Sequence, residues 1–389
     1  MSRRWLVLAV GTAAQATQAA VLSGLAVLAP SLQHRFGLTL GEVGLLLGSC
    51  GAGAIATMLP WGLAADRFGE RVTAAIGLTG AAAGLAGAAA AGSFWLLLVA
   101  LAFAGAFGAS TQSATGRAVT GWFSREQRGL ALSIRQTAIP IGGLAAGVVL
   151  PQVVSAAGPR AALTGLAGAS AVAAVAAGAF LAEGPPHDEA PAAALDRHPL
   201  RDSRLWRLSF GSGLLVATQV IMLGFVVVFL ENARGFSTAG AAAVLAGINV
   251  VGGVGRLASG RLSDVRGTRL APMRRIAVAT AGTTVLVATL VRASPLVLAP
   301  ALVAAVEYAG RARSGVGVGL QQTALGVAGA LTPIAFGPFV AATSWRAGFA
   351  AAAAFPLLGL AALRGLRDER AAQTAAARAS ASRPPVGTA

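Results

Sequence analysis

The stretch GLAADRFGER at residues 62–71 returns later in the chain as GRLSDVRGTR at residues 260–269. Both copies keep two glycines at the same spacing, with an aspartate between them: Asp66 in the first copy and Asp264 in the second. Glycine permits a tight turn, and an aspartate can face the positively polarised N-terminus of a neighbouring helix. Two copies of one charged turn indicate an internal duplication.

The duplication extends beyond these turns, because further pairs of residues align in the same order. They are Gly37 with Gly235, Thr39 with Ser237, Arg135 with Gln321, and Arg160 with Arg346. A polar, proline-rich stretch lies between the two copies. We therefore predict two pseudo-symmetric six-helix halves at residues 1–182 and 206–366, a cytoplasmic linker at 183–205, and a disordered cytoplasmic tail at 367–389.

The chain is too apolar and too poor in charge to be a soluble globular protein. Of its 389 residues, 56% are hydrophobic and 11% are charged, and the mean hydropathy is +0.71. Soluble domains carry roughly a quarter charged residues. The uncharged stretches reach the length of about 20 residues that a helix needs to cross a membrane, and the one at 72–116 is long enough for two, with a break at Gly92. We predict an all-α membrane protein with twelve transmembrane helices, the weakest starting near Pro295.

All thirty basic residues are arginine, and their distribution predicts the orientation of the chain. If the first helix starts in the cytoplasm, twenty-four arginines fall in cytoplasmic segments and five in outer loops, and Arg135 lies inside a helix. Basic residues favour the cytoplasmic side, so we expect a multi-pass protein of the cell membrane with both termini cytoplasmic. The net charge of +16 then reflects topology and contact with the lipid bilayer, and it requires no nucleic-acid partner.

Several classes of function lack their characteristic residues in this sequence. Cys50 is the only cysteine, the three histidines are scattered, and there is no phosphate-binding glycine-rich loop. We therefore expect no disulfide, no metal site, no cofactor and no direct use of ATP. A membrane enzyme or a sensor would need a catalytic cluster or a soluble signalling domain, and neither is present.

Residues 62–71 resemble the signature G-x-x-x-D-R-x-G-R-R, which the major facilitator superfamily carries between its second and third helices. Glu70 stands where that signature has a basic residue, and Val265 departs from it in the second copy. The resemblance implies a cytoplasmic gate in which Asp66 meets the start of the stretch at 314–345 and stabilises the outward-facing state. The alternative is an ordinary charged turn. The gate residues would be Gly62, Asp66, Arg67, Gly69, Arg71, Asp264 and Arg269.

Residues 117–121 are similar to a second element of the superfamily, R-x-x-q-G, with Thr120 in place of glutamine. The next stretch, at residues 121–143, resembles the corresponding region of cyanate- and nitrate-type permeases and related metabolite carriers. It lacks the glycine-asparagine signature of a nitrate carrier. Around Pro140 the stretch also partly resembles a motif of proton antiporters. That motif has a glycine before the proline, and this chain has Ile139 there.

Polar side chains within the spans are candidates to line a substrate cavity, because buried amides and hydroxyls in a bilayer need partners. The resemblance places that cavity between the first, fourth, seventh and tenth helices. The alternative is that these side chains only join neighbouring helices. The neutral candidates are Gln15, Gln18, Gln112, Ser113, Gln219, Asn249 and Gln321.

Three further candidates are ionisable. They are stronger evidence for a functional site, because placing a charge at membrane depth is costly. Arg135 and Arg117 have no acidic neighbour within the spans of the first half, so we expect one of them to hold an anion; Arg135 could otherwise extend to the membrane surface. Glu307 is the candidate for coupling transport to protons. The alternative for Glu307 is a local ion pair with Arg311.

Glycines spaced by four residues predict where helices of the two halves pack closely. The pairs are Gly44/Gly48, Gly143/Gly147 and Gly315/Gly319.

Together, the features of the sequence predict a monomeric secondary transporter that moves a small anionic organic solute by alternating access, with protons as a candidate coupling ion. The alternative is a proton-coupled antiporter that exports drugs or metabolites.

Overall fold

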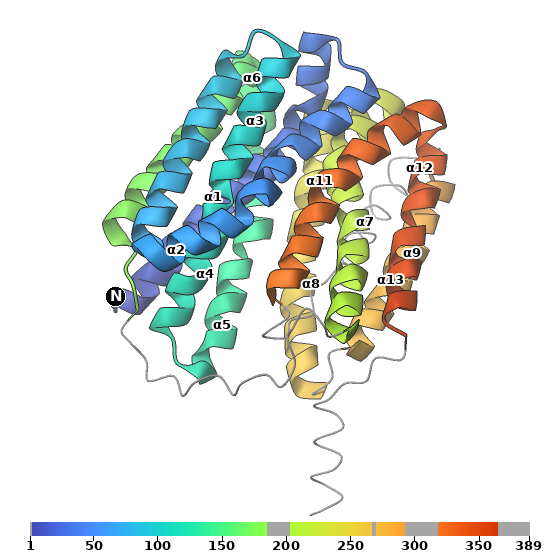
Figure 1. Ribbon diagram of the computed structural model, residues 1–389. Helices are drawn as coiled ribbons and strands as arrows, with labels where there is room; N and C mark the ends of the chain where they lie inside the picture. The colour runs from blue at the N-terminus through green and yellow to red at the C-terminus, as the bar shows by residue number, and fades with distance from the viewer. Residues whose placement is uncertain (1, 185–202, 267–269, 292–317, 365–389) are drawn as a thin grey trace, which may run out of the picture.

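The computed structural model describes residues 2–184, 203–266, 270–291 and 318–364, and those residues form helices and no strand (Figure 1). The helices are α1 (Arg3–Phe36), α2 (Leu40–Ala90), α3 (Phe94–Gly108), α4 (Ser110–Trp122), α5 (Arg125–Gln136), α6 (Ala138–Phe180), α7 (Ser203–Arg234), α8 (Thr238–Arg266), α9 (Leu270–Thr289), α11 (Val318–Ala342), α12 (Trp345–Ala352) and α13 (Ala354–Ala362). The predicted span that starts near Pro295, with Glu307 in it, lies outside this part of the chain. So does Arg269.

Seven helices in the described ranges are long and apolar enough to cross a membrane. Two of them are much longer than one crossing requires: α2 has 51 residues, about 77 Å of helix, against a hydrocarbon core of about 30 Å. Within α2 the chain turns at Gly69, which has φ 77°, and within α6 it turns at Gly158, which has φ 79°. Only glycine adopts this backbone conformation readily. The number twelve and the two halves stay predictions.

Residues that align between the two copies of the repeat have the same local roles. Gly37 ends α1 with φ 64°, and Gly235 follows α7 with φ 69°. The hydroxyl of Thr39 accepts from the amide of Glu42 at the start of α2, and Ser237 accepts from Gly240 at the start of α8. Hydroxyl residues at this position satisfy amides that a helix leaves unpaired.

The break predicted at Gly92 is confirmed. α2 ends at Ala90, and Ser93 caps α3 by accepting from the amide of Leu96 at 3.4 Å. The two helices then pack against each other, so the stretch forms the predicted hairpin.

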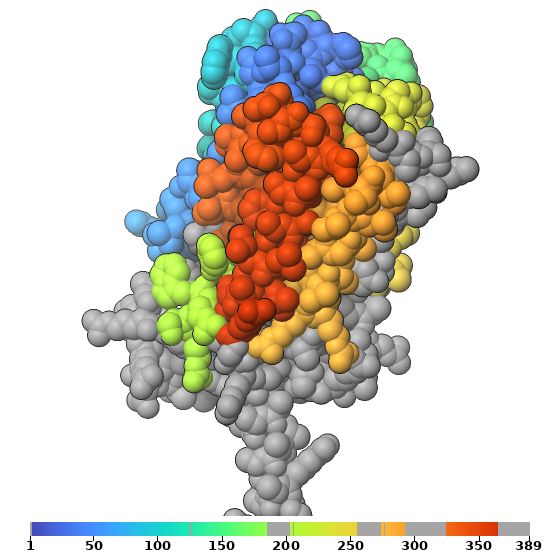
Figure 2. All heavy atoms as spheres, turned by 90° about the vertical axis from the view of Figure 1, so that its right-hand side faces the viewer, coloured from blue at the N-terminus to red at the C-terminus, as the bar shows by residue number. Residues whose placement is uncertain are grey.

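Among the described residues, the part of the chain before residue 185 meets the part after it mainly at α1 with α7, α2 with α11, and α6 with α8. Glycines make the last two contacts close. A β-carbon on Gly44 would overlap the carbonyl oxygen of Pro333 in α11, and one on Gly143 would overlap the amide of Asn249 in α8. The first two predicted glycine pairs therefore lie in close helix contacts, and the third begins outside the described residues. Figure 2 shows another face, on which α9 lies beside α12 and α13.

The hydrophobic core is continuous at one end of the molecule and divided at the other. We call the end at which α1 begins and α13 ends the terminal end, and the opposite one the far end (Figure 1). The largest core cluster draws on α1, α2, α3 and α6 and also on α7, α8 and α11, and it includes the last turns of α1 and α7. Toward the terminal end, one cluster contains Val7, Leu78 and Ala118, and a separate one contains Leu215, Ala277 and Leu363. In the described residues, the two parts of the chain therefore share a core only toward the far end.

Candidate functional site

Arg135 lies on the inward face of α5, where it points at α4. Ala131, Arg135 and Ala138 are buried at helical spacing, whereas Leu130 on the opposite face is 62% exposed. The side chain of Arg135 is only 3% exposed. The sequence pattern of α5 is amphipathic, and the helix turns its one deep charge toward its neighbour.

Oxygen atoms of α4 hold the Arg135 guanidinium. Nε donates to Oγ1 of Thr115 at 3.0 Å, and Nη2 donates to the carbonyl oxygen of Gln112 at 3.1 Å and to its Oε1 at 3.0 Å. Gln112 lies ten residues before the end of α4 at Trp122, about 15 Å along the helix. The guanidinium therefore lies against the middle of α4.

Two glutamines extend this polar group to α1. Nε2 of Gln15 donates to Oε1 of Gln136, the residue next to Arg135, at 3.1 Å. We call Gln15, Gln112, Thr115, Arg135 and Gln136 the Arg135 cluster. Sequence reasoning singled out three of its members and missed two: Thr115, three residues after Gln112, and Gln136, which adjoins Arg135.

The other candidates on α1 and α4 lie close to the cluster. The side-chain amide of Gln18 lies against Gly108, where a β-carbon would overlap it, and Ser113 is half-buried beside Gln112. The structure therefore brings the predicted polar faces of α1 and α4 together.

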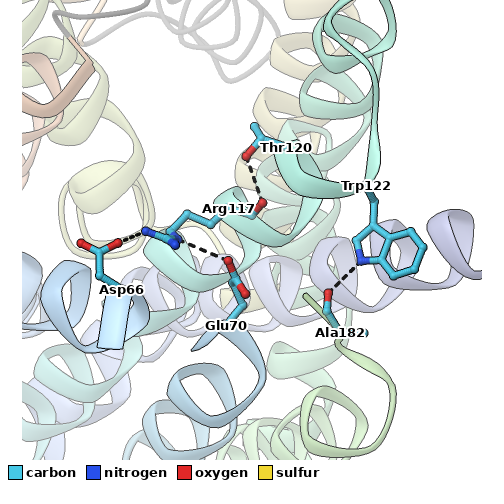
Figure 3. Close-up of polar contacts among 6 residues, drawn as sticks. All are labelled: Asp66, Glu70, Arg117, Thr120, Trp122 and Ala182. Carbon is cyan, nitrogen blue, oxygen red and sulfur yellow. Dashed lines mark hydrogen bonds and ion pairs between the residues drawn. The ribbon is translucent and has the colours of Figure 1, made fainter. Parts of the chain in front are cut away.

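Arg117 lies apart from the Arg135 cluster, near the terminal end of α4. It forms ion pairs with Asp66 and with Glu70, whose Oε1 lies 3.3 Å from Nε of Arg117 (Figure 3). The expectation that Arg117 faces no acid was therefore wrong. The reason is that the signature turn lies against α4: it brings Asp66 to Arg117 and also Glu70, an acid where the resembled signature is basic.

Around this ion pair, the signature turn is packed against the chain that follows α6. Gly69 adopts a positive φ, and a β-carbon there would overlap the carboxylate of Glu183. Nε of Arg71 donates to the carbonyl oxygen of Gly178, and Nε1 of Trp122 donates to that of Ala182 at 2.8 Å (Figure 3). The turn at residues 66–71 thus holds the start of the predicted linker.

The remaining gate residues differ in their surroundings. The guanidinium of Arg67 lies 5.5 Å from the ring centre of Phe68, and within the described residues a β-carbon on Gly62 would meet no other segment within 4 Å. A close helix contact at Gly62 is therefore not seen. Asp66 pairs with Arg117 of α4, whereas the side chains at the start of α11 and that of Asp264 lie outside the description.

The candidates in the helices after residue 203 do not form one cluster in the described part of the chain. Gln219 is half-buried on α7, next to Thr218, which donates to the carbonyl oxygen of Ala352 at 3.0 Å. Asn249 donates to the carbonyl oxygen of Leu245 at 2.9 Å while its amide packs on Gly143, so it belongs to the α6–α8 contact. The side chain of Gln321 lies outside the description. In the described ranges, no group of three His, Cys, Asp or Glu residues could hold a metal ion.

Comparisons with known proteins agree on one family. The model of the family described as Major Facilitator Superfamily matches residues 11–306. Two curated proteins named uncharacterized MFS-type transporters, from the CDC 1551 / Oshkosh and H37Rv strains of Mycobacterium tuberculosis, are each 33% identical over 371 residues. The match covers 91% of this chain and 83% of each relative.

Solved transporters share the fold at low sequence identity. A bacterial homolog of the human lysosomal transporter Spinster, in an inward-facing and occupied conformation, superposes with a TM-score of 0.76 at 16% identity, over 93% of this chain and 96% of that one. The nucleoside transporter NupG superposes with a TM-score of 0.68 at 16% identity, over 92% and 98%.

Proposed function

The chain belongs to the Major Facilitator Superfamily and is a multi-pass membrane transporter, and from that premise we propose that it moves a small anionic organic solute by alternating access. The observation that carries the proposal is the Arg135 guanidinium, buried about 15 Å from the end of α4 and held in place by side chains of that helix.

A buried guanidinium suits the recognition of an anion. Gln112 and Thr115 fix its direction by accepting hydrogen bonds from Nη2 and Nε. Arginine binds carboxylate and phosphate through parallel hydrogen bonds, which give direction as well as energy. The solute we propose therefore carries a carboxylate or a phosphate.

The rest of the Arg135 cluster supports recognition of a small polar molecule. Gln15 and Gln136 bring amide donors and acceptors from α1 and α5 to the same place. Amide groups can bind the hydroxyl or carbonyl groups of an organic acid without adding charge. Glu307 stays the candidate for proton coupling.

The same proposal includes an orientation. Arg3, Arg128, Arg207 and Arg274 lie toward the terminal end, whereas Arg35 and Arg234 lie at the far end. Since arginines concentrate on the cytoplasmic side of bacterial membrane proteins, we place the terminal end in the cytoplasm.

Transport in liposomes tests the function. A panel of carboxylates, organic phosphates and neutral solutes is first screened for thermal stabilisation of the purified protein, and uptake of the stabilising solutes is then measured. Arg135→Gln should reduce uptake at least tenfold, since a hydrogen bond to a charged group contributes about 1.5–3 kcal/mol. Arg135→Lys should keep part of it, because the charge remains but the fork of parallel donors is lost.

Arg346→Gln, at the start of α12, is the matched control and should leave uptake unchanged. Unchanged uptake in Arg135→Gln would refute the anion site. If uptake were unchanged and cells that express the protein also became resistant to apolar drugs, the proton-coupled antiporter would replace the anion transporter as the proposed function.

A further inference from the structure

The helix that carries Gln112 and Thr115 is interrupted one turn before them. α3 ends at Gly108 and α4 begins at Ser110, with Ala109 between them. In an uninterrupted helix, the carbonyl oxygen of Ala106 would accept from the amide of Ser110.

At this interruption, two side chains of α2 donate hydrogen bonds to the Ala106 carbonyl oxygen. Oγ1 of Thr57 and Nε1 of Trp61 each lie 2.6 Å from it. The hydroxyl of Thr57 also lies 3.1 Å from the carbonyl oxygen of Gly53 in its own helix, so the contact across to α3 is the shorter one. The Trp61 ring packs edge-on against Phe107, with ring centres 5.6 Å apart.

Thr57 and Trp61 belong to one row of residues on α2 that faces α3. Gly53, Thr57 and Trp61 are spaced by four, and a β-carbon on Gly53 would overlap the carbonyl oxygen of Ala102. Residues three or four apart share a helix face. A second row, including Gly44 and Gly48, faces α11 instead. α2 therefore lies between α11 and the interrupted helix (Figure 1).

The interruption lies directly before the part of α4 that faces Arg135. Each residue of an α-helix turns the chain by about 100°. Ala109 keeps helical backbone angles, φ −58° and ψ −28°, and its amide bonds the carbonyl oxygen of Gly105. Gln112 and Thr115 follow it by three and six residues, so a change in these angles would turn both of them relative to α5. Their hydrogen bonds to Arg135 need distances near 3 Å and would not survive such a rotation.

We propose that Thr57 and Trp61 are positioning residues for the Arg135 cluster: by binding the Ala106 carbonyl oxygen they keep the helix interrupted at Ala109, and so direct Gln112 and Thr115 at Arg135. The role in recognition rests on the proposed function. The structural link does not, because it concerns hydrogen bonds within the protein.

Hydrogen–deuterium exchange of the full-length protein in lipid nanodiscs, without any solute, tests the link. In Thr57→Val/Trp61→Phe both donors are removed: valine keeps the shape of threonine, and phenylalanine keeps an aromatic ring of smaller size. The Ala106 carbonyl should then accept from the Ser110 amide, and exchange at Ser110 should slow roughly three- to tenfold. Phenylglyoxal labelling of Arg135, followed by peptide mapping, should increase severalfold as its hydrogen bonds to α4 are lost.

Matched variants separate positioning from general damage. Thr57→Ser keeps the hydroxyl and should behave like the wild type. Thr283→Val removes a hydroxyl that bonds Ala279 in its own helix, and Trp95→Phe alters a tryptophan that is 68% exposed; both should leave Ser110 exchange and Arg135 labelling unchanged.

Unchanged or faster exchange at Ser110, or unchanged labelling of Arg135, would overturn the proposal. This result is independent of the transport assay. If Arg135→Gln left uptake intact, the anion site would fail while the structural link could still hold. If Arg135→Gln reduced uptake but the double variant left exchange and labelling unchanged, the link would fail while the anion site held.

Discussion

At the scale of single residues, Glu70 shows how one substitution redirects a charge network. The signature that residues 62–71 resemble has a basic residue at this position, and here an acid lies beside Arg117. The side chain of Glu70 is 10% exposed, against 58% for Asp66, so the two carboxylates depend on Arg117 to different degrees. An exposed ion pair is worth little, whereas a buried carboxylate left without its partner is costly.

Stability measurements on charge-removing variants test this difference. Asp66→Asn should lower the free energy of unfolding by no more than about 1 kcal/mol. Arg117→Gln should lower it by about 1–3 kcal/mol, because Glu70 then stays buried without its cation. Thermal unfolding in detergent measures both. Adding Glu70→Gln to Arg117→Gln should restore part of the loss, and equal effects of the two single variants would contradict the explanation.

At the scale of elements, α2 makes more contacts with other helices than any other helix in the described part of the chain. It packs on α3, α4 and α6 and also on α11. Its glycines at positions 44 and 48 allow the backbone of α11 to approach closely, and Gly53 does the same for α3. In a membrane, where apolar surface gains nothing by leaving lipid, such close packing supplies much of the attraction between helices.

Adding one methyl group at these contacts should therefore be harmful. Gly44→Ala would place a β-carbon against the carbonyl oxygen of Pro333 and should destabilise the protein by about 1–3 kcal/mol. Gly168→Ala in α6 has open space and should be neutral, or stabilising by up to about 1 kcal/mol. Thermal unfolding compares the two, and a Gly44→Ala variant as stable as Gly168→Ala would show that the contact is not close.

At the scale of the whole molecule, the structure is closed at the far end. The last turns of α1 and α7 meet there, and Nδ2 of Asn232 donates to Oε1 of Gln33 at 2.7 Å. The largest core cluster surrounds this contact, whereas toward the terminal end the described residues form separate clusters. On the proposed orientation, with the terminal end in the cytoplasm, we infer that this arrangement is an inward-facing state.

Cross-linking tests whether the far end must open during transport. In a Cys50→Ala background, Gln33→Cys/Asn232→Cys should react with a short bifunctional thiosulfonate in the absence of solute. Uptake should then fall to background, because alternating access separates α1 from α7 at this end. A reducing agent should restore it. Each single-cysteine variant serves as control, and full uptake by the cross-linked protein would mean that the far-end contact is not a gate.

The sequence alone predicted the membrane class, the break at Gly92, and the close contacts at Gly44 and Gly143. The physical reason is that a bilayer leaves the backbone no partner but its own helix, so apolar length and glycine position decide local structure. The cost of burying polar groups in a bilayer also marked Gln15, Gln112 and Arg135 as candidates for a cavity.

Only the tertiary structure decided which side chains on those faces meet. The pairing of Arg117 with Glu70, the contact of Arg135 with Thr115, and the capture of the Ala106 carbonyl by Thr57 and Trp61 all join residues on different helices or helix segments. A periodic pattern says which face of a helix turns inward. It does not say how far each helix is rotated or shifted along its neighbour, and a displacement of one ångström is enough to make or break a hydrogen bond.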